Sequence, residues 1–305
     1  MTFQRVAIIG LGLLGGSTGL AVREYLPGVA TTGWDADPAT RVRAAERGLV
    51  SQVFDNAADA VAGADLVILC VPVGAMGAAA AAIAPGLAAD VLVSDVGSSK
   101  QFVAKTLAEA LPGVAVIPAH PVAGTERSGP DAGFAALFQQ RWCIITPPAD
   151  ADPAKLQALS QFWQALGANV EVMDAQHHDL VLAVTSHLPH LIAYTIVGTA
   201  DDLEGVTQSE VIKYSAGGFR DFTRIAASDP TMWRDVFLSN KDAVLEMLQR
   251  FTEDLTALQR SIRLGDGNAL FEHFSRTRAI RQSIIKEGQD DARPDFGRSD
   301  HTAAG

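Results

Sequence analysis

The sequence predicts an α/β domain with a mostly parallel sheet, followed by an all-helical domain. Short apolar runs alternate with helical stretches through about residue 173, and after that point apolar residues recur only at helical spacing. A glycine-rich turn, GLGLLG, follows the first apolar run and precedes a helical stretch, as in doubly wound sheets that bind dinucleotides. We therefore expect a Rossmann domain over 1–173, a helical domain over 174–287, and a disordered, polar tail over 288–305.

The alternation in the first half defines the expected strands and helices. The apolar runs that we interpret as strands of a parallel sheet are VAIIG, ATTGWD, DLVILCV, VLVSDV and VAVIPA (114–119). Helical stretches over 38–47, 75–84 and 100–110 separate them. The runs RWCIITP (141–147) and NVEVM (169–173), with a helix over 153–166 between them, are expected to extend the same alternation.

The second half contains helical patterns only. Apolar residues follow the helical period through 176–200, 207–217, 229–262 and 266–287. Helices with such broad apolar faces often bury them against a second copy of the chain. We therefore expect a homodimer formed through the helical domain.

Composition limits the possible partners and the compartment. The chain has 305 residues, 48% of them hydrophobic and 19% charged, which is typical of a soluble globular protein with two domains. A net charge of −11 argues against nucleic acid or an anionic membrane as a partner. Cys70 and Cys143 stand in apolar runs without CxxC spacing, so we expect buried thiols and a cytoplasmic location.

Two segments resemble membrane or secretion signals. Residues 66–89 contain no charge, but they divide into a β-branched run, a Pro-Gly turn and an alanine-rich helix. The apolar stretch after Arg5 resembles a signal peptide, yet its glycines have the spacing of a nucleotide-binding turn. We therefore expect neither a membrane span nor a signal peptide.

The glycine-rich turn predicts a phosphate site. Gly10 allows the tight turn, Gly12 lets backbone amides approach a pyrophosphate, and Gly15 permits close packing of the helix. Leu13 and Leu14 begin that helix, whose positive end points at the phosphates.

Asp35 predicts the choice of cofactor. It ends the next apolar run, 20 residues after Gly15, where a carboxylate can bind the 2′-hydroxyl of a ribose. The same charge repels a 2′-phosphate, so NAD is favoured over NADP. Asp37 is expected only to cap the helix that begins at Pro38.

Ligands of such sheets bind at the carboxyl ends of the strands, where three polar segments are expected to meet. These are Val71-Pro72-Val73, the turn from Asp95 to Lys100, and His120-Pro121. Ser98 is expected to point into the cleft, whereas Ser99 is expected to cap the helix that begins at Lys100.

The second half supplies matching polar groups. SHLPH contains His187 and His190, three residues apart, and GGFRDFTR contains Arg220, Asp221 and Arg224. The two histidines could bind a metal, although no Cys or HExxH accompanies them, or they could be satisfied within a core, as could His177 and His178. We expect no metal site.

Taken together, GLGLLGGS, DVGSSK, HPVAGTERSG, SHLPH and GGFRDFTRIAASDPTMW resemble the prephenate/arogenate dehydrogenases of tyrosine biosynthesis, in order across residues 5–285. The resemblance implies a Rossmann domain, a helical dimerisation domain and an active site between them. It also implies NAD-dependent oxidative decarboxylation, with hydride leaving ring carbon C4 and the ring carboxylate leaving as CO2. No chorismate mutase segment or regulatory domain is expected beside this catalytic unit.

The resemblance also implies roles for individual residues. His120 would accept a hydrogen bond from the C4 hydroxyl, a task suited to a neutral imidazole, and Ser98 would share that hydroxyl and steady the histidine. Arg224 would bind a substrate carboxylate. His190 would line the same pocket, and Asp221 would orient Arg224 or gate the entrance, while Trp233 would pack beneath the arginine segment.

Substrate choice is left open between prephenate and arogenate, with prephenate favoured. Glu126 could sense the amino group of arogenate, or it could be a solvated loop acid. Thr125 and Gly217 complete the expected substrate site, and Gly124 would leave room for substrate and cofactor.

Two other interpretations use the same fold. A β-hydroxyacid dehydrogenase or imine reductase would need a catalytic lysine on the helical domain, for which Lys213 and Lys241 are available. A non-catalytic NAD sensor would bind the cofactor without turnover, although the presence of both His120 and Arg224 argues against it.

Overall fold

The computed structural model describes residues 3–125, 127–202 and 217–286. The chain divides into two compact units, one through Met247 and one from Leu248 onward, and each is described by itself. The predicted helix over 207–217 lies almost wholly outside the described residues, as do Glu126, Lys213 and the predicted tail.

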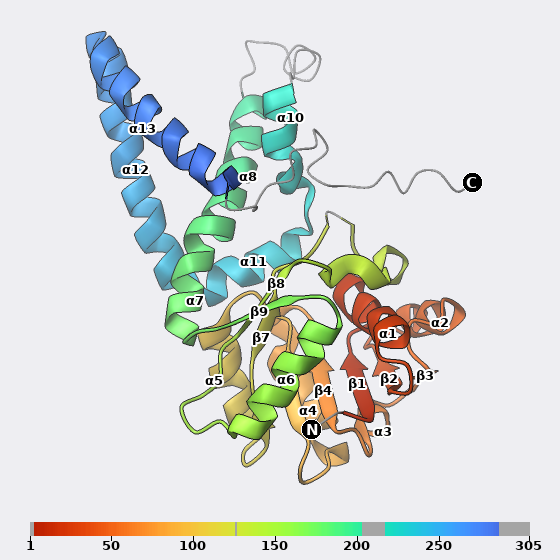
Figure 1. Ribbon diagram of the computed structural model, residues 1–305. Helices are drawn as coiled ribbons and strands as arrows, with labels where there is room; N and C mark the ends of the chain where they lie inside the picture. The colour runs from red at the N-terminus through yellow and green to blue at the C-terminus, as the bar shows by residue number, and fades with distance from the viewer. Residues whose placement is uncertain (1–2, 126, 203–216, 287–305) are drawn as a thin grey trace. The chain divides into compact units, whose positions relative to one another are not determined.

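A six-stranded parallel sheet forms the centre of the first unit (Figure 1). Its strand order is β3-β2-β1-β4-β5-β6, which is the order of a doubly wound sheet, so the predicted fold class is confirmed. The strands are β1 (Arg5–Ile9), β2 (Ala30–Trp34), β3 (Gln52–Val53), β4 (Leu66–Leu69), β5 (Leu92–Asp95) and β6 (Ala115–Val116).

Helices cover both faces of this sheet because its strands are apolar on both sides (Figure 1). In β1, Val6 and Ile8 enter one core cluster with α1 and α6, whereas Ala7 and Ile9 enter the other with α3, α4 and α5. The helices of this half are α1 (Leu13–Tyr25), α2 (Pro38–Glu46), α3 (Ala57–Val61), α4 (Met76–Ile83), α5 (Lys100–Ala110) and α6 (Pro153–Ala165).

A second, three-stranded sheet corrects one part of the sequence analysis. The run 114–119 is not one strand, because Pro118 lacks an amide N–H and the chain leaves the parallel sheet after β6. The chain then forms β7 (Ala119–Pro121), which pairs antiparallel with β8 (Trp142–Ile145), and β8 pairs parallel with β9 (Asn169–Val172). The last two runs therefore build a separate sheet instead of extending the first.

The helical part of the first unit begins with a nearly continuous helix. Between α7 (Ala175–Leu182) and α8 (Leu188–Asp201), residues Ala183–His187 form a π-helical turn. Pro189 is the second residue after this turn, and a wider turn accommodates a proline that cannot donate the regular helical hydrogen bond. Then come α10 (Gly217–Thr223), a 3₁₀ turn (Arg224–Ala227) and α11 (Pro230–Ser239).

The predicted helix over 229–262 is interrupted. Asn240 ends α11 with a non-helical backbone, and α12 (Lys241–Leu264) begins at the next residue. The side chain of Asn240 is buried and donates a hydrogen bond to the carbonyl of Asp179, so the break has a tertiary cause.

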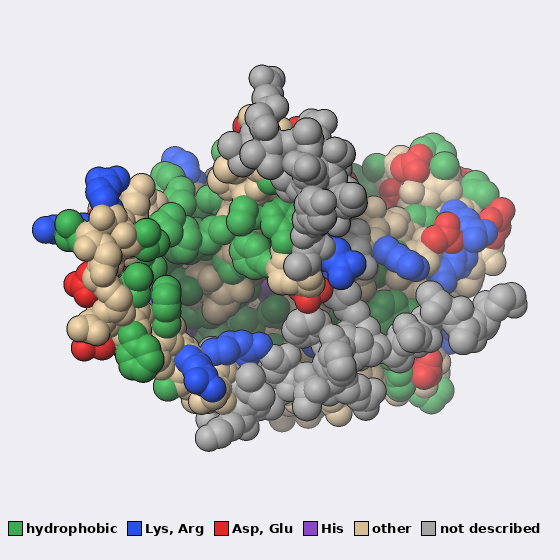
Figure 2. Space-filling view, turned by 90° about the horizontal axis from the view of Figure 1, so that it is seen from above, with side chains coloured by type: hydrophobic (Ala, Val, Ile, Leu, Met, Phe, Trp, Pro, Cys, Tyr) green, Lys and Arg blue, Asp and Glu red, His purple; other side chains and the backbone are tan. Residues whose placement is uncertain are grey.

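The second unit contains the remainder of α12, followed by α13 (Gly267–Lys286). Hydrophobic side chains lie among charged ones over these helices, at the left of Figure 2. The large apolar residues of this unit that are more than half exposed are Leu255, Ile262, Leu264, Phe271, Phe274 and Ile280.

One described helical stretch, Ala175–Asp201, is long and apolar enough to cross a membrane. This criterion uses length and composition alone, and the core helix of a soluble protein also meets it. The uncharged segment 66–89 is a strand, a 3₁₀ turn and a short helix, as expected.

Candidate active site

The glycine-rich turn has the geometry that a pyrophosphate requires. Gly10 has a φ of +97°, which a residue with a side chain rarely adopts. A Cβ on Gly15 would lie 1.8 Å from the carbonyl oxygen of Gly10, so only glycine fits there. At Gly12 a Cβ would meet nothing within 4 Å, and α1 has neither a side-chain cap nor an acidic residue in its first turn. Its first amides therefore remain available to an anion.

Asp35 lies against this turn directly after β2. Its Oδ2 accepts a hydrogen bond of 2.7 Å from the Leu11 amide, and its Oδ1 accepts one of 2.9 Å from the Asp37 amide. Asp37 caps α2, as predicted. On the other side of the turn, Val71 lies 3.0 Å from where a Cβ on Gly10 would stand, and Pro72 is exposed.

A buried ion pair forms the carboxyl end of β5. Lys100 Nζ contacts the carboxylate of Asp95, and neither side chain has any exposed surface. Lys100 also donates to the carbonyl of Ala119 at 2.7 Å, while Asp95 accepts from the amides of Gly97 and Ala119. Burial raises the pKa of Asp95 and lowers that of Lys100, and their mutual attraction opposes both shifts. The pair therefore connects β5 to β7.

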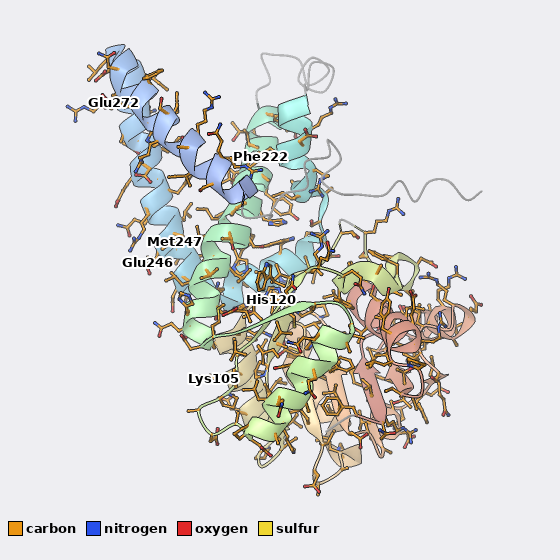
Figure 3. The ribbon with its side chains drawn as sticks, viewed as in Figure 1. Lys105, His120, Phe222, Glu246, Met247 and Glu272 are labelled. Carbon is orange, nitrogen blue, oxygen red and sulfur yellow. The ribbon has the colours of Figure 1, made fainter. Side chains whose placement is uncertain are left out.

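His120 lies in β7 beside this pair and is only 8% exposed (Figure 3). Burial lowers its pKa well below the usual value, and its electrostatic interactions with His178, Lys100 and His187 lower it further. The imidazole is therefore neutral near pH 7 and can accept a hydrogen bond.

A chain of hydrogen bonds connects His120 to α7. His120 Nδ1 lies 2.8 Å from His178 Nε2, and His178 Nδ1 lies 2.8 Å from Asp179 Oδ1. Burial alone would raise the pKa of Asp179, but hydrogen bonds from His178 and from the backbone amides of Lys100 and Gln101 outweigh it and lower that pKa. Asp179 is therefore a charged carboxylate.

Asp179 also replaces the cap that we expected from Ser99. The amides of Lys100 and Gln101, at the start of α5, donate to the two oxygens of Asp179 at 2.6 and 3.0 Å. Ser99 makes no capping bond, and its hydroxyl lies instead 2.7 Å from that of Ser239. The expected cap was wrong because a carboxylate from a distant helix competes for the same amides.

The histidines of SHLPH pack against the ring of Trp233. His190 stacks on Trp233 with ring centroids 3.6 Å apart, and His187 meets the edge of the same ring. Trp233 therefore packs against histidines. Burial lowers the pKa of His187 to about 4. Burial also lowers the pKa of His190, and the charge of Arg224 lowers it further. The 3₁₀ turn that begins at Arg224 packs against α8, the helix of His190.

The other predicted residues are half-buried or exposed. Ser98 is half-buried in the turn after β5, and Gly217, Asp221 and Arg224 are exposed in and after α10. Thr125 is exposed and accepts a hydrogen bond from the Arg127 amide at 3.2 Å.

The described residues bear on two other hypotheses, a catalytic lysine on the helical domain and a metal site. Lys241 is 63% exposed beside Asp242, unlike a lysine held in a closed pocket. Within the described ranges no three His, Cys, Asp or Glu side chains form a metal-binding group. Cys70 and Cys143 are free thiols.

Sequence reasoning missed three residues of this cluster. They are Lys100, which was treated only as a helix start, and the pair His178 and Asp179, of which only the histidine was considered, as a core residue. Asp95 and Lys100, five residues apart at the end of an apolar run, are a usable signal, because burying such charges is costly unless they are paired.

Comparisons with known proteins cover most of the chain. The family models described as "Prephenate dehydrogenase, nucleotide-binding domain" and "Prephenate dehydrogenase, dimerization domain" match residues 18–172 and 174–276. The chain is 45% identical over 282 residues to cyclohexadienyl dehydrogenase of Zymomonas mobilis, covering 92% of this chain and 96% of that relative. It is 32% identical to prephenate dehydrogenase of Bacillus subtilis, covering 92% and 76%.

Among solved structures, the chain is similar to prephenate dehydrogenase from A. aeolicus in complex with hydroxyphenyl propionate and NAD+. The TM-score is 0.86 and the identity is 32%, covering 93% of this chain and 99% of that one.

Substitution of Lys100 by Met is expected to lower the free energy of unfolding by roughly 3–5 kcal/mol, because it leaves the Asp95 carboxylate buried without its partner. The double variant Asp95→Asn/Lys100→Met removes both charges and is expected to lose less. Urea unfolding followed by tryptophan fluorescence measures both. Equal losses in the single and double variants would contradict the assignment.

Proposed function

The chain belongs to the prephenate dehydrogenase family, and on that premise we propose that its chemistry is carried out by His120 in the cluster at the end of β5 and β7. The enzyme catalyses NAD-dependent oxidative decarboxylation of a cyclohexadienyl substrate in tyrosine biosynthesis. A single observation supports His120 most strongly: a neutral, almost fully buried imidazole lies beside the carboxyl end of the nucleotide-binding sheet.

NAD fits the residues at the glycine-rich turn. The open space at Gly12 and the uncapped amides of α1 suit the pyrophosphate, with Leu13 and Leu14 starting that helix. Asp35, whose oxygens still have lone pairs to offer, suits the ribose hydroxyls and disfavours a 2′-phosphate. Val71, Pro72 and Ser98 would border the nicotinamide end. When bound, NAD supplies the acceptor for the hydride.

His120 performs the part of the reaction that belongs to the protein. As the hydride leaves C4, that carbon becomes electron-poor, and the hydroxyl on it becomes a stronger hydrogen-bond donor. The free nitrogen of His120 accepts this hydrogen bond. The electron pair of the bond to the departing carboxylate then enters the ring, CO2 leaves, and the phenolic oxygen keeps its proton. Ser98 shares the same hydroxyl.

The substrate carboxylates require a cation. Arg224, close to His190, supplies a planar fork for one of them, and His190 lines the same pocket on its Trp233 base. Thr125, Asp221 and Gly217 are the proposed rim of the pocket.

Two further proposals concern organisation. The domains divide at residues 173 and 174, a division supported by the ranges of the two family descriptions. The enzyme works in the cytoplasm, which the two free thiols, Cys70 and Cys143, support.

Prephenate and arogenate both contain the cyclohexadienyl ring, and we propose that prephenate is the preferred substrate. Glu126, the carboxylate that could sense the amino group of arogenate, lies outside the described residues. We expect NADH formation with both compounds and a higher kcat/KM for prephenate, measured by NADH absorbance. A higher kcat/KM for arogenate would reverse the preference.

Replacement of His120 by Asn is expected to lower kcat by ~10²-fold or more, because the acceptor for the C4 hydroxyl is lost. NAD affinity, measured by protein fluorescence, should stay unchanged, since the glycine-rich turn is untouched. The exposed His177→Gln variant is the matched control. Full turnover in His120→Asn would remove this residue from the mechanism.

A homodimer formed through the helical domain is supported by the dimerization-domain description and by the exposed Phe271 (73%) and Phe274 (55%). Light scattering coupled to gel filtration should give twice the chain mass. The double variant Phe271→Asp/Phe274→Asp should shift the protein toward monomer, whereas Val42→Asp, on exposed α2, should not. A monomeric wild type would exclude the dimer.

A further inference from the structure

An imidazole can accept a hydrogen bond at only one nitrogen, and the other nitrogen decides which one. If His120 is to accept from a hydroxyl in the cleft, its proton has to lie on Nδ1 and leave Nε2 bare. The hydrogen-bond partner of Nδ1, and not the geometry of the strand, determines which ring nitrogen carries the proton.

The partner of His120 Nδ1 is itself constrained. Asp179 is a carboxylate that can only accept, so His178 Nδ1, 2.8 Å away, donates to it. Burial lowers the pKa of His178, so the ring carries one proton near pH 7. His178 Nε2 is therefore an acceptor, and His120 Nδ1, 2.8 Å from it, is the donor.

Asp179 is in turn held in place from the opposite side. The first amides of α5 donate to both of its oxygens, and its own carbonyl accepts from Asn240 at 2.8 Å. Neither the carboxylate nor α7 can turn away without breaking several buried hydrogen bonds.

We infer that His178, held by Asp179, is a positioning residue that fixes His120 in the tautomer whose Nε2 accepts a hydrogen bond. The inference rests on the role proposed above for His120. During the reaction the hydroxyl proton moves toward Nε2, positive charge grows on His120, and the chain spreads that charge toward Asp179. The phenolic oxygen retains the proton after CO2 leaves, so no net proton enters the chain.

The direct test is the protonation state of His120 in the wild-type enzyme. Nitrogen NMR of protein labelled at histidine distinguishes protonated from bare ring nitrogens, and loss of a signal in His120→Asn assigns it. We expect a protonated Nδ1 and a bare Nε2 on His120 at neutral pH. A protonated Nε2 would overturn the inference whether or not the His178 variants fold.

Two substitutions at the same position test the effect on turnover. His178→Phe keeps a ring against His120, where the present centroids are 5.1 Å apart, but removes the acceptor. We expect kcat to fall by up to ~10²-fold while KM and NAD affinity stay unchanged. His178→Gln offers an amide oxygen near the former Nε2 and should recover part of the loss, which a purely structural role would not predict.

The outcomes separate the two proposals. Loss of turnover in His120→Asn together with full turnover in His178→Phe would overturn the positioning role alone. Full turnover in His120→Asn would overturn the proposed function of His120. His177→Gln, one residue away and exposed, should match the wild type throughout.

Discussion

The side chain of Asp179 comes from α7, yet its oxygens bind the first amides of α5 and the ring of His178. A carboxylate buried this deeply is tolerable only because several donors converge on it. The same contacts fix the start of the helix that carries Lys100, and Lys100 fixes Asp95 and the carbonyl before His120. Two sheets and the first helix of the helical half are therefore connected through a few charged groups that are almost completely buried.

The pattern of the first half predicted the doubly wound sheet, because its strands, its helices and its glycine-rich turn depend on residues that are close together in the sequence. The errors occurred where a tertiary contact decided the outcome. Pro118 moves the chain from one sheet to another within a run that is apolar throughout. Asn240 ends a helix because its amide is needed by Asp179 and His187, which lie far away in the sequence.

The same distinction holds for the site. Gly10, Gly15 and Asp35 could be identified by spacing, since their roles depend on a single turn and the next strand. His120 could be identified from its motif. The buried neighbours of His120 could not, because His178 is brought to it by a helix 58 residues further along the chain. A helical pattern shows that a residue is buried but not what it meets.

The strand order places the residue proposed to select the cofactor and the residue proposed to act on the substrate ring at different strands. Asp35 follows β2 and His120 lies beside the end of β5, and β1 and β4 run between them in the sheet. At roughly 4.8 Å per strand, that places the proposed ribose site at Asp35 and the proposed catalytic site at His120 about 14 Å apart. Selection for a different cofactor could therefore rebuild the loop after β2 without disturbing the buried charges around His120. The fold permits cofactor use and ring chemistry to evolve as independent traits.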